Sequence, residues 1–151
     1  MVAAGPAKAL ELELQRAAKA GDCKAVRQLV RRGARLNAQD VDGWTALHAA
    51  AAEGRLSSVE LLLSHADVID ANVATLDGRT PLYLAALEGS LECVRALLAH
   101  GADPHAATPE GRGPRDVAVL FGHGEVVSEL EAALKLPPPP GGEPGAGGGW
   151  R

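Results

Sequence analysis

The chain has 151 residues, of which 46% are hydrophobic and only 3% aromatic, and it carries a formal net charge of −4. This length suits one domain, and so few aromatic residues favour a thin core of Leu, Val and Ala between helices. No apolar run reaches the roughly 18–20 residues that span a bilayer, and no signal-peptide pattern opens the chain, so we expect a soluble, intracellular protein of the cytoplasm or nucleus without membrane contact.

Helical periodicity begins at about Lys8, and residues 1–7 before it are expected to be flexible. Residues 8–40 predict two helices. Gly21 is expected to end the first and Gly33 the second, because glycine readily adopts the left-handed conformation that follows a helix. The apolar face of the first helix comprises Leu10, Leu14, Ala17 and Ala18.

Charge is unevenly distributed along the chain. Residues 1–35 contain eight basic and three acidic residues, a net charge of +5, whereas residues 36–151 carry −9. Two interpretations stay open. The basic end could steer an acidic partner towards the molecule, or it could be the solvated outer face of a terminal repeat.

The clearest signal is a stretch of nine residues that recurs. Residues 42–50 read DGWTALHAA, residues 77–85 read DGRTPLYLA, and a fainter copy at residues 110–118 reads EGRGPRDVA. The copies are 35 and 33 residues apart, and a period near 33 indicates stacked helical repeats.

Each copy predicts a turn followed by a helix. Asp42 and Asp77 are expected to bond their own downstream backbone, each beside a glycine that tolerates positive φ. Thr45 and Thr80 are placed to cap a helix with their hydroxyls. Pro81 suits the first helical position, because the N–H that it lacks would have no partner there.

With this period and a Thr-Pro-Leu-His-like core, residues 8–136 resemble the ankyrin repeat family. The resemblance implies an all-α solenoid of about four helix-turn-helix repeats, joined by short hairpin turns, at about 8–40, 41–75, 76–107 and 108–136. It also implies that His48 bonds a threonine hydroxyl and the backbone across repeats. Asn37 takes a turn position where the family's asparagine bonds the backbone across hairpins and can be hydroxylated.

The chain departs from the family pattern at three places. Residues 64–72 are two residues longer than their counterparts and lack their glycine, so we expect this loop to bulge outward. Tyr83 replaces the family's histidine, which weakens the expectation of a polar bridge at that junction. Gly113 replaces the threonine in the last repeat, which ends with the polarity of a C-terminal cap.

Residues 137–151 are rich in Pro and Gly and predict a disordered tail that starts with a short polyproline II segment. Two interpretations stay open for the tail: a plain disordered end, or a ligand for an aromatic groove. Cys23 and Cys93 fall in different repeats, too far apart for a disulfide, and are predicted to be free thiols.

No pattern for catalysis emerges, since the chain has no phosphate-binding loop, no nucleophile elbow and no Cys-x-x-Cys pair. We predict no catalytic residue, no cofactor and no small-molecule substrate. The nearest histidine pair, His100 and His105, is explained by repeat positions, so no metal site is predicted. A pI near 5.7 and basic residues without interleaved aromatics argue against nucleic acid.

The function class that remains is recognition of a partner protein. The resemblance places the hairpin tips and first helices around a concave groove, so we predict a monomeric, non-catalytic module that binds a partner protein there. The alternatives are a dedicated inhibitor or regulatory subunit that occludes a partner enzyme or transcription factor, and an enzyme. The partner-binding positions implied are Val41, Asp42, Trp44, Glu53, Leu76, Asp77, Arg79, Leu87, Glu88, Glu110, Arg112, Leu120 and Phe121.

Three of these residues also have a structural interpretation. Trp44 either anchors a partner or lies flat on its own turn, whereas Leu120 and Phe121 either contact a partner or tuck under the last repeat. If Trp44 contacts a partner, the substitution Trp44→Ala is expected to weaken binding and to leave the melting curve nearly unchanged. Leu62 and Leu97 are predicted to lie between helices.

Overall fold

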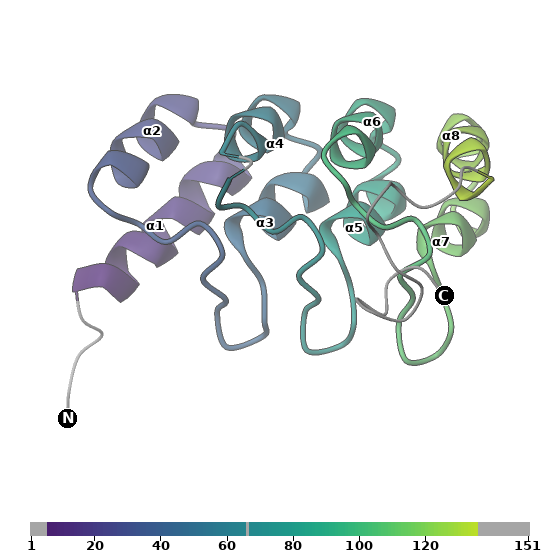
Figure 1. The fold of residues 1–151 in the computed structure, drawn as a ribbon, viewed down its shortest axis with the longest axis horizontal. Coiled ribbons are helices and arrows are strands. Elements are labelled where there is room, and N and C mark those ends of the chain that lie inside the picture. The colour runs from purple at the N-terminus through teal and green to yellow at the C-terminus, as the bar shows by residue number, and fades with distance from the viewer. Residues whose placement is uncertain (1–5, 66, 136–151) are drawn as a thin grey trace.

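Within the residues that the computed structural model describes, 6–65 and 67–135, four helix pairs stand side by side in a single row (Figure 1). The inner helices form one layer and are α1 (Pro6–Ala20), α3 (Ala46–Ala52), α5 (Pro81–Glu88) and α7 (Pro114–Leu120). The outer helices form the other layer and are α2 (Cys23–Arg31), α4 (Leu56–Leu63), α6 (Leu91–Ala99) and α8 (Gly124–Leu134). Hairpin turns project beyond the inner layer, and the expected all-α solenoid is confirmed.

Both ends of the described chain are helical. α1 starts at Pro6, inside the segment 1–7 that the sequence predicts to be flexible, and α8 ends at Leu134. Residues 1–5 and the predicted Pro/Gly tail, 137–151, lie outside the described residues. Among the described helices, none combines the length and the apolar character that crossing a membrane requires.

The inner helices begin where the recurring motif predicts. The Thr45 hydroxyl accepts a hydrogen bond from the His48 N–H at 3.3 Å, and Thr80 caps α5 in the same way. In the eroded last copy, Gly113 has no side chain to offer, and the Asp116 carboxylate accepts a hydrogen bond from the Gly113 N–H at 2.8 Å. The reciprocal half of a capping arrangement therefore survives where the threonine is lost.

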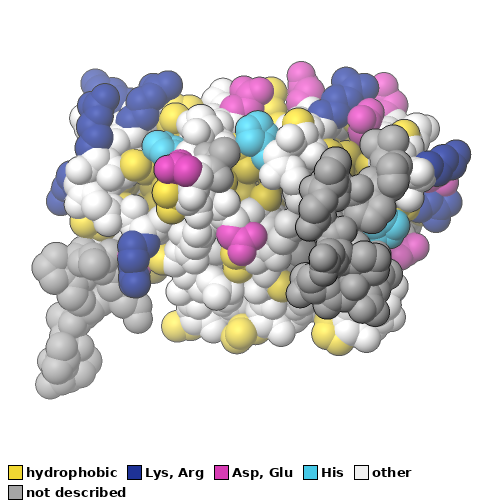
Figure 2. Space-filling view, viewed as in Figure 1, with side chains coloured by type: hydrophobic (Ala, Val, Ile, Leu, Met, Phe, Trp, Pro, Cys, Tyr) yellow, Lys and Arg dark blue, Asp and Glu magenta, His cyan; other side chains and the backbone are white. Residues whose placement is uncertain are grey.

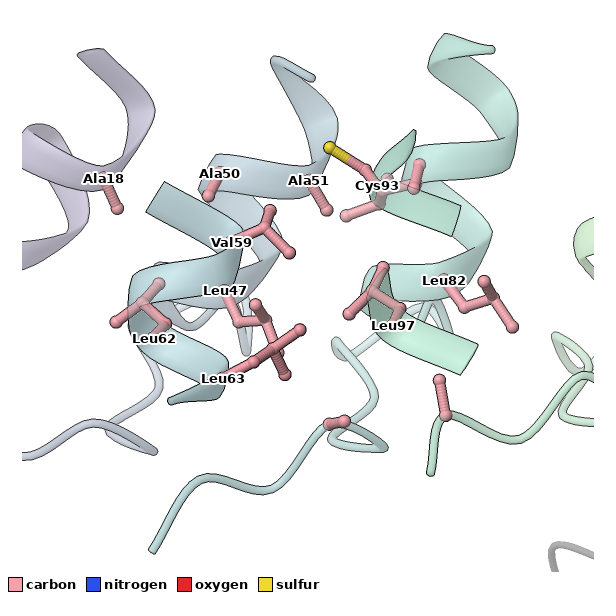
Figure 3. Close-up of a cluster of buried hydrophobic side chains, with 14 of the residues drawn as sticks. Ala18, Leu47, Ala50, Ala51, Val59, Leu62, Leu63, Leu82, Cys93 and Leu97 are labelled. Atoms are coloured by element: carbon pink, nitrogen blue, oxygen red, sulfur yellow. The ribbon is translucent and has the colours of Figure 1, made fainter. Parts of the chain in front are cut away.

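The core is a thin layer of small and branched side chains between the two rows of helices. Ala18, Ala51 and Ala86 take equivalent places on successive inner helices and are fully buried, so neighbouring backbones can approach closely. Leu62 and Leu97 on the outer helices are also fully buried, which confirms that they lie between helices. Figure 3 shows these leucines in one cluster that continues from one helix pair to the next.

An ion pair replaces apolar packing at the C-terminal end of the row. Arg115 on α7 takes the place that Leu47 has on α3, and Glu131 on α8 takes the place that Leu63 has on α4. Both leucines are fully buried. The Arg115 Nη2 and Glu131 Oε2 atoms lie 2.6 Å apart, with 42% and 41% of the two side chains exposed. Charges at these places offer no apolar surface to a further repeat, which is the polarity of a cap.

Candidate functional site

Three hairpin turns share one hydrogen-bonding pattern. The first residue of each turn, Asp40, Thr75 or Thr108, donates its N–H to the carbonyl oxygen four residues later at 2.9 Å. Its side-chain oxygen accepts the N–H of that same later residue, at 2.9, 3.0 and 3.3 Å respectively. The prediction that Asp42 bonds its downstream backbone was wrong, because the residue that opens the turn is the one whose side chain reaches across it.

Hydrogen bonds also join the first hairpin to the second. The Leu76 N–H donates to the Asp42 carbonyl oxygen at 3.0 Å, and the Gln39 amide donates to the Ala74 carbonyl oxygen at 3.1 Å. Beyond these bonds, Val41 and Leu76 are 81% and 78% exposed at the two tips. Figure 2 shows hydrophobic side chains along the lower edge of the molecule, where the hairpins end. The hairpins therefore present a regularly spaced apolar edge.

His48 bridges two hairpins from a fully buried position on α3. Its Nδ1 atom accepts the Thr45 backbone N–H at 3.1 Å and lies 2.8 Å from the Thr45 hydroxyl oxygen. Nε2 consequently carries the proton and donates to the Arg79 carbonyl oxygen at 3.0 Å, which confirms the implied bridge. At the next junction, Tyr83 forms no such bond with a described residue, and its ring centroid lies 5.7 Å from the Arg79 guanidinium carbon.

Acid is expected to destabilise the fold through His48. Burial lowers the pKa of the His48 imidazole, so the folded chain resists a proton that the unfolded chain accepts. The stability linked to His48 is fully present above the ordinary histidine pKa of about 6.5 and is lost as the pH falls through that value towards the folded pKa. Urea melts between about pH 7.5 and about pH 5.5 should show a larger loss for the wild type than for His48→Gln. Equal losses would contradict a neutral, buried imidazole.

Asn37 and Asn72 fasten the loops that follow the outer helices. The Asn37 amide donates to the Val68 carbonyl oxygen at 2.7 Å and accepts the Asp70 N–H at 2.8 Å, which is the role that the resemblance implies. Asn72 repeats this pair of bonds one loop later, at 3.0 and 2.7 Å. The Val68 side chain is 55% exposed. The longer loop of residues 64–72 thus turns a side chain outward while its backbone is held by Asn37.

Two clefts open beside α1 and share Leu12, Gln15 and Asp40. The Gln15 amide donates to Asp40 Oδ2 at 3.0 Å, which ties α1 to the first hairpin. The larger cleft has a volume of about 920 Å³ and extends to the loop after α4. The smaller cleft has a volume of about 300 Å³, and its lining residues are Leu12, Gln15, Arg16, Lys19, Asp40, Asp42, Trp44, Ala49, Ala52 and Glu53.

The sequence left two interpretations of Trp44 open, support of its own turn and contact with a partner, and the surroundings of its side chain are compatible with both. Its side chain is half-buried and packs against the core, and its ring centroid lies 5.9 Å from that of His48. The same side chain lines the smaller cleft, together with Ala49 and Ala52 of α3. Trp44 therefore supports its own turn on one side and faces an open cleft on the other.

The structure brings three of the predicted binding residues together, since Asp42, Trp44 and Glu53 all line the smaller cleft. The others are spread along the row. The Arg79 Nε atom pairs with Asp77 Oδ2 at 3.2 Å on the second hairpin. Of the remaining predicted residues, Leu87 is half-buried. The others are exposed: Val41, Leu76, Glu88, Glu110, Arg112, Leu120 and Phe121.

The last inner helix leaves apolar side chains uncovered. Leu120 and Phe121 are 62% and 57% exposed, so the alternative that they tuck under the last repeat was wrong. The Phe121 ring stacks beside His123, with ring centroids 6.5 Å apart and an interplanar angle of 12°. His123 in turn bonds the Leu87 carbonyl oxygen at 3.1 Å from Nε2, so the imidazole faces both Phe121 and the preceding helix pair.

The contribution of α1 to the smaller cleft was not predicted from the sequence. Leu12, Arg16 and Lys19 line this cleft beside Trp44, although the first repeat lacks the recurring motif. A signal was available, because counting back from the glycine that follows each inner helix puts Lys19 at the place of Ala52. By the same count Arg16 takes the place of Ala49, so two basic side chains lie where the next repeat has alanines.

The described residues show no arrangement for metal chemistry. In residues 6–65 and 67–135, no three His, Cys, Asp or Glu side chains gather in a way that could hold a metal ion. Cys23 and Cys93 are free thiols, as predicted. Burial raises the pKa of the Cys93 thiol, which keeps this fully buried group neutral and inert in the core.

Comparison with known proteins points to one family. The family model described as ankyrin repeats (3 copies) matches residues 14–108 and 68–133. The 2-5A-dependent ribonuclease of Mus musculus is 49% identical over 53 residues, which make up 34% of this chain and only 7% of that protein. Domains of this family are in general non-catalytic modules for protein–protein interaction. The chain belongs to the ankyrin repeat family.

Proposed function

We propose that this chain binds a partner protein in the concave groove between its hairpin turns and inner helices. The smaller cleft carries the proposal. Trp44 and Leu12 supply apolar walls, and Lys19 and Glu53 supply opposite charges around them. An aromatic side chain in a pocket ringed by polar groups is the typical composition of a binding hot spot. The cleft is therefore suited to an apolar side chain of the partner.

Apolar residues further along the row extend the proposed contact surface. Leu87 is half-buried on α5, and Leu120 and Phe121 are exposed at the end of α7. Leu87 and Leu120 take the place of Ala52 on their own inner helices. Large apolar side chains that recur at one position of a stack and are at least partly exposed support a shared binding face.

Trp44→Ala is expected to weaken binding of the natural partner by roughly 30-fold, the loss typical of a hot-spot aromatic. Because Trp44 is half-buried, its truncation is also expected to cost roughly 1 kcal/mol of folding stability, more than the near-zero change expected from the sequence. Affinity capture from cells with the wild-type chain identifies the partner. Calorimetry with that partner then measures the difference between wild type and variant.

Leu91→Ala is the matched control. Leu91 is half-buried and packs against the core, as Trp44 does, but it starts the outer helix α6, away from the groove. It should lose a similar amount of stability and keep full affinity. If both variants lose affinity in proportion to their unfolded fraction, Trp44 acts only in folding. If the Trp44→Ala variant binds the partner with wild-type affinity, the proposed role of the cleft is wrong.

The proposal includes a monomeric, non-catalytic chain in the cytoplasm or nucleus. Two free cysteines support an intracellular location, because cysteines of secreted domains are usually paired. The alternative of a dedicated inhibitor makes a separate prediction. An inhibitor would abolish the working activity of the captured partner at saturation, whereas a plain interaction module would leave it unchanged.

A further inference from the structure

The outer face of α2 is strongly basic. Lys24, Arg27, Arg31 and the following residue, Arg32, are all exposed, and α2 itself contains no acidic residue. Figure 2 shows Lys and Arg side chains gathered over this helix at one end of the row. The outer helix at the other end, α8, contains three acidic residues and no basic one. The charge of the outer layer is thus polarised along the row.

The charges of α2 are not neutralised by the described part of the fold. Ion pairs within 4.0 Å in residues 6–65 and 67–135 use none of the cations of α2, and their basic partners are Arg35, Arg79, Arg95 and Arg115. Arg27 and Arg31 are four residues apart, and like charges at this spacing destabilise a helix. Mixed charges would solubilise an end helix as well. Because the cations of α2 share one sign and take part in no ion pair within the described residues, they point to an anionic partner.

We infer that the outer face of α2 binds a short acidic segment of a partner protein. The helix has nine residues and is about 14 Å long at ~1.5 Å per residue, which about four residues of extended chain would span. Successive side chains of an extended chain point to opposite sides, so about two carboxylates of such a segment would face the cations of α2. This surface belongs to the outer layer and is separate from the groove, so it is independent of the proposed function.

Two other polyanions fit this surface less well. The aromatic residues of the described chain are Trp44, Tyr83 and Phe121. They lie on the hairpins or at the inner helices, so within this part of the chain α2 has no ring on which bases could stack. A long nucleic acid would also meet the net charge of −9 of residues 36–151. A bilayer would require apolar side chains beside the cations, and the large exposed hydrophobic residues of the described chain all lie outside α2.

Fluorescence anisotropy of a labelled peptide of about 12 residues, with alternating Asp and Gly, tests the inference on the full chain. We expect saturable binding at about 50 mM salt that weakens strongly at about 200 mM. Arg27→Gln with Arg31→Gln should weaken it about fivefold, since each exposed pair contributes only a small factor. Glutamine matches arginine in helix propensity, so far-UV circular dichroism should be unchanged. The second double variant, Lys24→Gln with Arg32→Gln, should give a similar loss.

Arg95→Gln with Lys135→Gln is the matched control, because it removes the same net charge from exposed positions on α6 and after α8. It should change peptide affinity by less than about twofold. Equal losses in the control and the α2 variants would overturn the inference, as would the absence of saturable binding up to about 1 mM peptide. Tighter binding of single-stranded DNA or of phosphatidylserine vesicles than of the peptide, at the same salt, would assign the surface to those polyanions instead.

Discussion

Leu62→Ala is expected to lower the free energy of unfolding by about 2–5 kcal/mol, which is the range for emptying a packed leucine site. The Leu62 side chain is fully buried on α4 and belongs to the cluster that joins the helix pairs (Figure 3). Helix pairs in such a row contact only their neighbours, so a cavity at one junction weakens the cooperative coupling between the helix pairs on either side of it. Leu97→Ala, one repeat later, should cost a similar amount. Equilibrium urea melts followed by circular dichroism measure both losses.

Leu61→Ala provides the comparison on the same helix. It changes the same side chain with the same effect on helix propensity, but Leu61 is only half-buried. The expected loss is therefore about 1 kcal/mol. A loss at Leu62 below about 0.5 kcal/mol, or equal losses at the two positions, would mean that the burial assigned to α4 is wrong.

The parts of the fold that local sequence determines were predicted well. Thr45 and Thr80 cap their helices as expected, because a cap depends on residues within three positions of it. Leu62 and Leu97 were placed correctly in the core, because helical periodicity puts them on the same face as their buried neighbours. The same reasoning predicted free cysteines, since residues in different repeats are separated by the stacking distance.

Long-range contacts were harder to predict. The pair between Arg115 and Glu131 joins two helices, and a sequence shows only that both positions depart from leucine. The support of the first turn by Asp40 was not predicted, because only Asp42 stands directly beside Gly43 and the prediction was made from that dipeptide. The period did contain the answer, because the equivalents of Asp40 are threonines, whose oxygens can make the same bond.

The candidate site was predicted in part. The family resemblance drew attention to Trp44, and the structure places it in a cleft with Asp42 and Glu53. The opposite wall, formed by Leu12 and Lys19, was missed because α1 lacks the motif on which the site prediction depended. Periodicity identifies equivalent positions only where a repeat resembles the others. A terminal repeat with a longer first helix therefore adds residues that the pattern does not show.

Gly43→Ala is expected to lower the free energy of unfolding by about 3 kcal/mol, as the sum of backbone strain and a clash with the next hairpin. Gly43 has φ +84°, a conformation that costs an L-residue roughly 1–2 kcal/mol. A Cβ atom there would also lie 2.7 Å from the Leu76 backbone nitrogen and 3.0 Å from Thr75 Cα. The Leu76 N–H is the group that bonds the Asp42 carbonyl oxygen, so the clash would break the link between the hairpins.

Gly111→Ala separates the two contributions. Gly111 occupies the same place in the last hairpin with φ +83°, but a Cβ atom there would meet nothing within 4 Å, since no further hairpin is packed against it in the described chain. This variant should therefore lose only the strain, roughly 1–2 kcal/mol, in urea melts run beside those of Gly43→Ala. The difference between the two variants measures the contact between hairpins that makes the row cooperative. If the two losses are equal, the first two hairpins do not pack as closely as the Leu76–Asp42 hydrogen bond requires, and the groove that they line is not held rigid.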